Sequence, residues 1–303
     1  MTKSRHLVAR QADAAFTVPE RYAALSKGFR RWTIVDERAS VHQDFGHCEL
    51  DPGGGIDAHV HSFEESFFVL SGEVVCHTTE GAFRLSEGDY GAVPVGSAHA
   101  WRNEGSEPAR WAEMLAPQAR LGGEGDTWPV GPLADVPVVD IDGRDPRTRS
   151  FGNIQPGNME VAKQRQEFLS ASASMRTALL VYSGITVKMM VDADLGASLA
   201  TMFMVQYEPG GFAGAHDHPL EETYLILEGS TDAVFDGHEY RLEPGDAAWA
   251  GVGCIHEFSN PNDGIVRWLE TQAPQPPARH SYRFGRDWTY LTEALDKRGQ
   301  QHG

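Results

Sequence analysis

The sequence predicts an all-β protein made of two tandem copies of one strand-rich domain, with a few peripheral helices. Short runs of β-branched and aromatic residues, such as SFFVLSGEVV and ATMFMVQY, alternate with Gly, Asp and Ser, a pattern typical of strands separated by turns. Glycine accounts for 32 of the 303 residues, above the usual ~7%, which indicates many turns. Many short strands with regularly spaced turns favour an antiparallel sandwich or barrel.

The duplication is visible in two stretches that resemble each other, PGGGIDAHVHSFEESFFVLSGEV from Pro52 and PGGFAGAHDHPLEETYLILEGST from Pro209. Their offset is 157 residues (209 − 52), and it persists without a gap over about 50 positions. Coincidental strand-and-turn composition would not keep one offset for so long, so we infer a tandem repeat. Matched pairs further along are Gly72 and Gly229, Gly88 and Gly245, Gly96 and Gly253, and Asn103 and Asn260.

The repeat divides the chain into an N-terminal domain, residues 1–130, and a C-terminal domain, residues 131–303. The strand-rich pattern covers about residues 30–117 in the first domain and 175–275 in the second. The segment from 117 to 149 is rich in Pro, Gly and Asp, so we interpret it as a linker with short extended pieces such as VPVVDI. Helical patterns are peripheral and occur at residues 19–28, 158–169 and 287–299.

Each copy contains a His-x-His pair, a Glu four residues after the second His, and a third His further along. Alternate residues of a strand point to one face, so the two imidazoles of a pair should project together. Three neutral imidazoles and a carboxylate suit Fe, Mn, Ni, Cu or Zn and can leave positions open for water, O2 or substrate. A single His in a strand is usually only hydrogen-bonded or solvated, but here the set recurs at identical spacing and uses six of the 13 histidines. We predict one divalent transition metal per domain, held by His59, His61, Glu65 and His99 and by His216, His218, Glu222 and His256.

These spacings resemble the two motifs of the cupin superfamily, G(x)5HxH(x)3,4E(x)6G and G(x)5PxG(x)2H(x)3N. The first motif fits from Gly53 and again from Gly210, and the second fits fully from Gly88. In the second copy Gly251 stands where the motif has Pro, as Pro94 does in the first copy, which affects the expected loop shape and not the ligands. The resemblance implies a two-domain bicupin, two jelly-roll barrels with a metal inside each, and a homodimer as the expected assembly.

The composition excludes several classes of partner. Lys and Arg total 26 against 43 Asp and Glu, a formal net charge of −17, which argues against nucleic acid and against an anionic membrane surface. No run of about 20 apolar residues occurs, and the first residues lack the apolar core of a secretory signal. Three widely spaced cysteines without a CxxC predict neither a disulfide framework nor a cysteine zinc site, and favour a cytoplasmic location.

Residues near the ligands in the strand pattern are candidates for a substrate pocket, because side chains two positions apart on a strand share a face. On this basis the pocket should be apolar and aromatic. The alternative is that these side chains only fill the barrel core, and that Cys254, which stands where the first copy has Ser97, is a packed small residue. The candidates are Phe67, Trp101, Asn103, Tyr224, Phe258 and Cys254.

The first functional hypothesis is a metal-dependent oxygenase, similar to the quercetinase-like and ring-cleaving cupin dioxygenases, acting on an aromatic or enolisable small molecule. Fe(II) is favoured, with Mn, Ni, Zn or Cu as alternatives, and Glu65 or Glu222 would be both ligand and catalytic base. Oxalate decarboxylases carry an Arg two residues before the His-x-His pair, whereas this chain has Asp57 and Gly214 there. The alternatives are a non-redox isomerase, lyase, hydrolase or decarboxylase, and a non-catalytic small-molecule binding protein.

Overall fold

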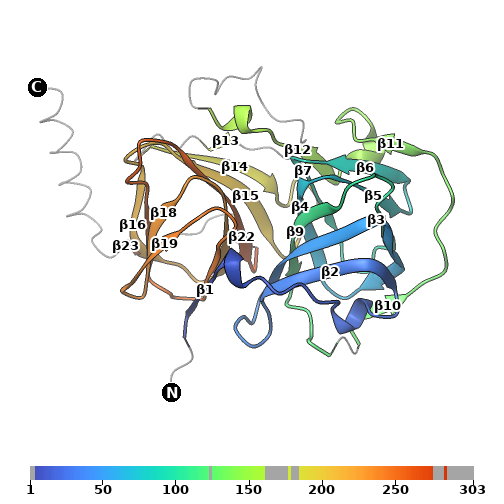
Figure 1. Cartoon of the computed structure of the whole chain (residues 1–303), viewed down its shortest axis with the longest axis horizontal. Helices are drawn as coiled ribbons and strands as arrows, with labels where there is room; N and C mark the ends of the chain where they lie inside the picture. The colour runs from blue at the N-terminus through green and yellow to red at the C-terminus, as the bar shows by residue number, and fades with distance from the viewer. Residues whose placement is uncertain (1–3, 123–124, 161–176, 179–183, 276–282, 285–303) are drawn as a thin grey trace, which may run out of the picture.

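The computed structural model describes residues 4–122, 125–160, 177–178, 184–275 and 283–284, and nearly all regular structure in them is β-strand. The strands curl into two barrels that lie side by side, one for each repeat (Figure 1). The expected all-β class with two jelly-roll barrels is confirmed. The N-terminal barrel contains β2 (Ser26–Val35), β3 (Asp44–His61), β4 (Glu64–Ser71), β5 (Glu73–Thr78), β6 (Ala82–Ser86), β7 (Asp89–Val93), β8 (His99–Arg102) and β9 (Ala109–Ala116).

The long strand β3 belongs to both faces of the N-terminal barrel. Its first half pairs with β9 and its second half pairs with β8. Between the halves Gly53 has a φ of 70°, a left-handed conformation that glycine adopts at little steric cost. This bend places His59 opposite His99 in register, so residues 40 positions apart become neighbours.

The C-terminal barrel repeats this arrangement with the long strand divided in two. β15 pairs with β22, and β16 pairs with β21, which places His216 opposite His256. The break between β15 and β16 contains Pro209, whose counterpart Pro52 lies within the continuous strand β3. β17, β21 and β22 repeat the bounds of β4, β8 and β9 at the offset of 157. The strands are β14 (Ile185–Val191), β15 (Thr201–Tyr207), β16 (Phe212–Asp217), β17 (Glu221–Glu228), β18 (Thr231–Phe235), β19 (His238–Leu242), β20 (Ala247–Ala250), β21 (His256–Ser259) and β22 (Val266–Ala273), with the short β13 (Thr177–Ala178) and β23 (Arg283–Phe284) at the sheet edges.

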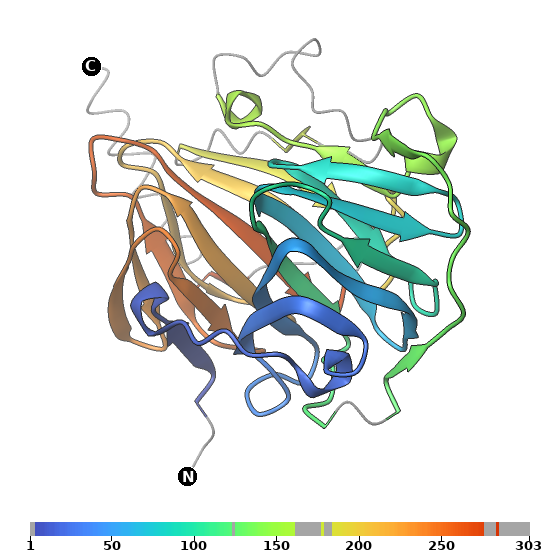
Figure 2. The ribbon, with the colours of Figure 1, turned by 45° about the vertical axis from the view of Figure 1, so that its right-hand side comes forward.

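The strand that leads into each barrel pairs with the other barrel. β1 (His6–Ala9) precedes the N-terminal barrel but pairs with β20 of the C-terminal one. β12 (Phe151–Asn153) precedes the C-terminal barrel but pairs with β7 of the N-terminal one. In Figures 1 and 2 the dark blue β1 lies against the orange strands of the other repeat. The domain boundary at residue 130 stays a proposal. Each side of this boundary supplies one strand that pairs with the barrel on the other side.

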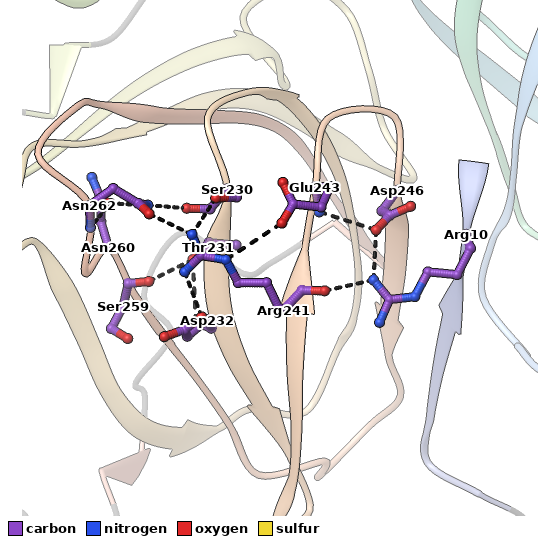
Figure 3. A network of polar contacts seen from close by, with 10 residues as sticks. All are labelled: Arg10, Ser230, Thr231, Asp232, Arg241, Glu243, Asp246, Ser259, Asn260 and Asn262. Atoms are coloured by element: carbon purple, nitrogen blue, oxygen red, sulfur yellow. Dashed lines mark hydrogen bonds and ion pairs between the residues drawn. The ribbon is translucent and has the colours of Figure 1, made fainter. Parts of the chain in front are cut away.

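Arginine side chains fix the N-terminal segment to the C-terminal barrel. Arg10 donates to Asp246 at 2.7 Å and to the carbonyl of Arg241 at 2.6 Å (Figure 3). Arg5 forms a bidentate ion pair with Asp236, with distances of 2.7 and 3.0 Å. The N-terminal segment is therefore held by the hydrogen bonds between β1 and β20 and by one arginine–aspartate ion pair at each end of β1.

Deleting residues 1–13 is expected to destabilise the C-terminal barrel selectively. The deletion removes about four ladder hydrogen bonds, each worth about 1 kcal/mol, so we expect a loss of about 2–4 kcal/mol in local stability. Hydrogen exchange measures this directly, because amides of β20 should lose protection while amides of β7 keep it. A matched deletion of residues 1–4 is the control, and equal loss of protection in β7 and β20 would contradict the pairing.

A hydrophobic core lies between the two barrels, in addition to the core inside each barrel. Outward-facing side chains of the N-terminal barrel, including Trp32, Phe68 and Met114, pack with Met204 and Trp249 of the C-terminal barrel, all buried. Burial of apolar surface contributes roughly 25 cal/mol per Å², so this core couples the repeats in one folded unit.

Two glutamates connect the repeats reciprocally. The Glu64 carboxylate accepts hydrogen bonds from the backbone N–H groups of Ser198, at 2.6 Å, and Leu199, at 3.3 Å. Its counterpart Glu221 accepts from the Ser40 hydroxyl and from the Val41 N–H. Both glutamates are nearly fully buried. The duplication therefore produces a pair of equivalent contacts, related by an approximate two-fold, between the barrels.

The helix expected at residues 19–28 is wrong. Only a 3-10 turn, η2 (Glu20–Tyr22), forms there, and β2 starts at Ser26. The reason is tertiary, because Tyr22 is buried against the rings of Phe29 and His59 and the following residues pair with β3. The other short helical turns of the described residues include η1 (Gln11–Asp13) and η3 (Pro146–Thr148).

The other two expected helices and the expected linker have different outcomes. Of the helix expected at 158–169, the structure describes only residues 158–160, where the 3-10 turn η4 (Pro156–Met159) ends and Glu160 is extended. The helix expected at 287–299 lies outside the described residues. The linker contains short strands as expected, β10 (Thr127–Pro129) and β11 (Val138–Asp140), and both pair with the N-terminal barrel. Among the residues that the structure describes, no helix is both long and apolar enough to cross a membrane.

Candidate metal centres

Each barrel brings together the three histidines that the sequence singles out. The triad of the N-terminal barrel consists of His59 and His61, near the end of β3, and His99 of β8. Each offers one ring nitrogen, and these three atoms lie within 4.8 Å of one another. In the C-terminal barrel His216, His218 and His256 meet the same criterion. All six side chains are buried or nearly so. Each triad could hold a metal ion.

The predicted glutamate of each set lies beside its triad. Glu65 Oε2 is 3.1 Å from His61 Nε2 and 3.2 Å from His99 Nε2. Glu222 Oε2 is 2.8 Å from His218 Nε2 and 3.3 Å from His256 Nε2. Both carboxylates are buried. The two four-residue sets therefore have the same arrangement, as the common spacing predicts.

The hydrogen bonds of the imidazoles test whether a metal fits. Every Nδ1 of the six lies 2.6–3.0 Å from a backbone carbonyl, which can only accept, so Nδ1 carries the hydrogen. In a neutral imidazole the Nε2 lone pair then faces the Glu carboxylate, and two acceptors at about 3 Å repel unless a cation lies between them. The buried His59 Nε2 and Glu65 Oε1 have no hydrogen-bond partner among the described residues. A divalent cation would satisfy these atoms, so the residues fit a metal.

The pKa shifts of His59, His216 and the two glutamates suit a metal. Burial lowers the pKa of His59 to about 3 and that of His216 to about 4, with further lowering by the neighbouring His99 and His256. Without a metal, the alternative is a second proton on the facing imidazole, at Nε2. Burial would raise the pKa of Glu65 and Glu222, but the hydrogen bond and charge of an imidazole protonated in this way outweigh burial, and the net shift is downward. Burial would lower the pKa of His218, but the hydrogen bond and charge of Glu222 outweigh burial and raise it. Neutral imidazoles and ionised carboxylates are the forms that bind divalent metals, so a metal at this centre would displace the proton of His218.

The surroundings of the two glutamates differ. In the C-terminal barrel the Tyr224 hydroxyl and the Gln272 amide both donate to Glu222, one to each carboxylate oxygen. At the offset of 157 the N-terminal barrel has Phe67 and Leu115, which have no polar group to donate. The C-terminal carboxylate is thus oriented by two side chains that its counterpart lacks.

A second buried glutamate accompanies each candidate centre, and the search for motifs missed both. Glu113 and Glu270 lie one strand away, opposite Phe67 and Tyr224 in register. Burial raises the pKa of Glu270 well above its usual value, as does the charge of Glu222. Glu113 lies in WAEMLA and Glu270 in WLETQA, and the two are separated by the same offset of 157 residues. Comparing the two repeats position by position could therefore have identified both glutamates.

Glu113 differs from Glu270 in having a guanidinium partner. Arg31 Nε lies 2.8 Å from Glu113 and Arg31 Nη2 lies 2.6 Å from Asp44, and all three side chains are at most 2% exposed. Lys188 stands at the position of Arg31 in the second repeat and is also buried. The N-terminal barrel therefore contains a buried carboxylate–guanidinium–carboxylate triad beside its candidate centre.

The residues proposed for a substrate pocket lie in or near the barrel interiors. The rings of Trp101 and Phe67 are 5.0 Å apart, and Tyr224 and Phe258 lie 6.0 and 6.3 Å from the ring of His256. These four belong to the barrel cores, so a role in binding substrate stays a prediction. Asn103 differs, because its amide binds the backbone of Leu50, Glu107 and Gly105 and holds a loop.

Cys254 is buried in the core of the C-terminal barrel. Burial raises the pKa of its thiol to about 12, and the neighbouring Asp236 acts in the same direction. The free side chain is therefore a neutral thiol at physiological pH.

A cavity of about 340 Å³ lies between the barrels, away from both candidate centres. Its walls combine apolar side chains with the charged Glu228 and Arg267, which form an ion pair at 2.9 Å. None of the residues expected in the metal or substrate sites lines it. The apolar lining includes Phe68, Leu70, Ile154, Met159, Met204 and Leu227.

Comparison with known proteins places these features in a family context. Residues 46–115 and 203–271 each match the family model described as Cupin domain. The HTH-type transcriptional regulator PuuR of Escherichia coli is 30% identical over 92 residues, which are 30% of this chain and 49% of PuuR. The chain thus spans about half the length of this curated relative.

Solved structures with the same fold cover most of the chain. A putative glyoxylate-induced protein of Pseudomonas aeruginosa has a TM-score of 0.64 at 18% identity, covering 93% of this chain and 92% of its own. An oxalate decarboxylase of Lactobacillus farciminis, in complex with formate, has 0.61 at 17%, covering 96% and 92%. A mutant of the salicylate 1,2-dioxygenase of Pseudoaminobacter salicylatoxidans, with gentisate, has 0.62 at 15%, covering 78% and 70%. At these identities the likeness shows the fold.

Proposed function

Because the chain is a bicupin of the cupin superfamily, with a triad of histidines and a glutamate in each barrel, we propose that it is a metal-dependent oxygenase. The proposed substrate is an aromatic or enolisable small molecule, with O2 as co-substrate. His59, His61, Glu65 and His99 would hold one metal, and His216, His218, Glu222 and His256 the other. Fe(II) is the favoured ion, since it supports oxygenase chemistry with nitrogen and oxygen ligands.

The proposed catalytic centre is in the C-terminal barrel. The observation that supports this choice is that two side chains donate hydrogen bonds to the Glu222 carboxylate. A bound divalent metal would supply Lewis acidity and a template for substrate and O2. Tyr224 and Gln272 would hold the Glu222 carboxylate in one orientation, so that it can receive the substrate proton without reorganising. Apolar residues Phe235 and Phe258 would exclude water around it.

The N-terminal centre is proposed to have a mainly structural role. Glu65 lacks the two side-chain donors that orient Glu222, since Phe67 and Leu115 stand in their places. The neighbouring Glu113 is paired with a fixed cation, Arg31, which cannot give up its proton. A metal there would chiefly tie β3 to β8.

The runner-up is a non-redox enzyme, such as a decarboxylase or isomerase, which the same ligand set supports. The oxalate decarboxylase fold likeness favours it, whereas Gly214 stands where decarboxylases of this kind carry a substrate-binding Arg. A small-molecule binding protein remains the third candidate, in keeping with the partial match to a transcriptional regulator.

Oxygen uptake by Fe(II)-loaded protein with a panel of phenolic and diketone substrates tests the proposal. We expect at least one substrate to be consumed with stoichiometric loss of O2. The same panel, with small carboxylic acids added, should be run anaerobically on Mn- and Zn-loaded protein. Turnover under anaerobic conditions without uptake in air would replace the oxygenase by the non-redox enzyme, and saturable binding without any turnover would favour the binding protein.

A further inference from the structure

A third cluster of metal-ligating side chains lies outside the two barrel centres. His6, Asp236 and Cys254 each offer one ligand atom, and the three atoms lie within 4.8 Å of one another. They come from distant parts of the chain. His6 belongs to the exchanged strand β1, Asp236 follows β18, and Cys254 precedes β21.

The imidazole of His6 is held with one nitrogen available. Its Nε2 lies 2.9 Å from the Tyr240 hydroxyl, and its ring stacks on Phe235 at 5.8 Å. The Nδ1 atom is buried and has no hydrogen-bond partner among the described residues. If Nε2 donates to Tyr240, the lone pair of Nδ1 is left for a cation, which is the usual arrangement of a metal-bound histidine.

The other two groups provide oxygen and sulfur. Asp236 is held by Arg5, at 2.7 and 3.0 Å, and by the backbone N–H of Ile255, at 3.1 Å. Carboxylate oxygens have further lone pairs for a metal, and Arg5 balances one negative charge. The Cys254 thiol is buried and would lose its proton on coordination.

This cluster is absent from the first repeat. The counterparts of Cys254 and Asp236 are Ser97 and Thr79. Strand register assigns Arg149 to the place of His6, because Phe151 pairs with Gly91 as Val8 pairs with Ala248. None of these three could supply the same ligands, so the cluster is independent of the duplicated metal motif.

We propose that His6, Asp236 and Cys254 form a third metal site, for a borderline divalent ion such as Zn²⁺. A nitrogen, an oxygen and a sulfur ligand with one open position match a three-ligand zinc site. A metal there would bind β1 to the C-terminal barrel, since His6 is the only one of the three ligands from the N-terminal segment.

Cobalt titration of the metal-stripped full chain tests this site apart from any activity. None of the eight proposed barrel ligands is a thiol, so a thiolate-to-cobalt charge-transfer band reports a cysteine. Cys48 and Cys76 are also free, so loss of the band in Cys254→Ser assigns it to Cys254. We expect three metal equivalents per chain and one such band. Cys254→Ser, which installs the residue of the first repeat, and His6→Gln should each lose one equivalent and the band. His238→Gln is the matched control, because its ring lies 5.2 Å from His6 but outside the cluster, and it should keep both.

Two results would overturn the proposal. The first is saturation at two equivalents without a thiolate band. The second is a band that survives in His6→Gln, which would assign the thiolate ligand to a different group of residues. Because His6→Gln leaves all eight proposed barrel ligands intact, loss of the third equivalent alone in this variant supports the site even if Cys254→Ser folds poorly.

Discussion

Replacing His218 by alanine is expected to remove one metal equivalent per chain and to lower turnover roughly a hundredfold or more. The substitution deletes one of three imidazoles and leaves Glu222 with a single histidine contact, from His256. Stabilisation of developing charge by a bound metal is worth several kcal/mol, and each 1.4 kcal/mol is a factor of ten in rate. Metal analysis and steady-state kinetics on the substrate found by oxygen uptake would measure both losses.

His61→Ala is the matched control for this prediction. It removes the equivalent imidazole of the N-terminal barrel, and we expect the loss of one metal but a smaller loss of turnover. The difference follows from Tyr224 and Gln272, which orient Glu222 and have no polar counterparts beside Glu65. Equal loss of turnover in the two variants, or unchanged metal content in either, would argue against this assignment.

Replacing Arg31 by methionine should give the largest loss of stability, about 3–5 kcal/mol. The guanidinium is 1% exposed and compensates both Asp44 and Glu113, so its removal leaves two buried carboxyl groups without a cation. Urea denaturation monitored by tryptophan fluorescence would show a lower midpoint.

The triple variant Arg31→Met, Asp44→Asn, Glu113→Gln separates the charge from the packing. With both carboxylates neutralised, no uncompensated buried charge remains, and most of the lost stability should return. If Arg31→Met alone costs less than about 1 kcal/mol, or the triple variant is no more stable than the single one, the triad does not have this role.

The candidate metal centres could be predicted from the sequence because their determinants are short-range and repeated. His59 and His61 share a face through the two-residue period of a strand, and the same spacing returns at His216 and His218. Glu113 and Glu270 obey the same offset and could have been found by extending it. The helix at 19–28 failed for the opposite reason, since burial of Tyr22 and pairing with β3 override a weak local preference.

By itself the sequence determined the duplication, the strand-rich fold and the eight candidate ligands, because these follow from local periodicity and a constant offset. Only the tertiary structure decided that β1 and β12 each pair with the opposite barrel, that Glu64 and Glu221 connect the repeats, and that His6 meets Cys254. Such contacts join residues up to about 250 positions apart, and their energies depend on burial and charge that no local pattern encodes.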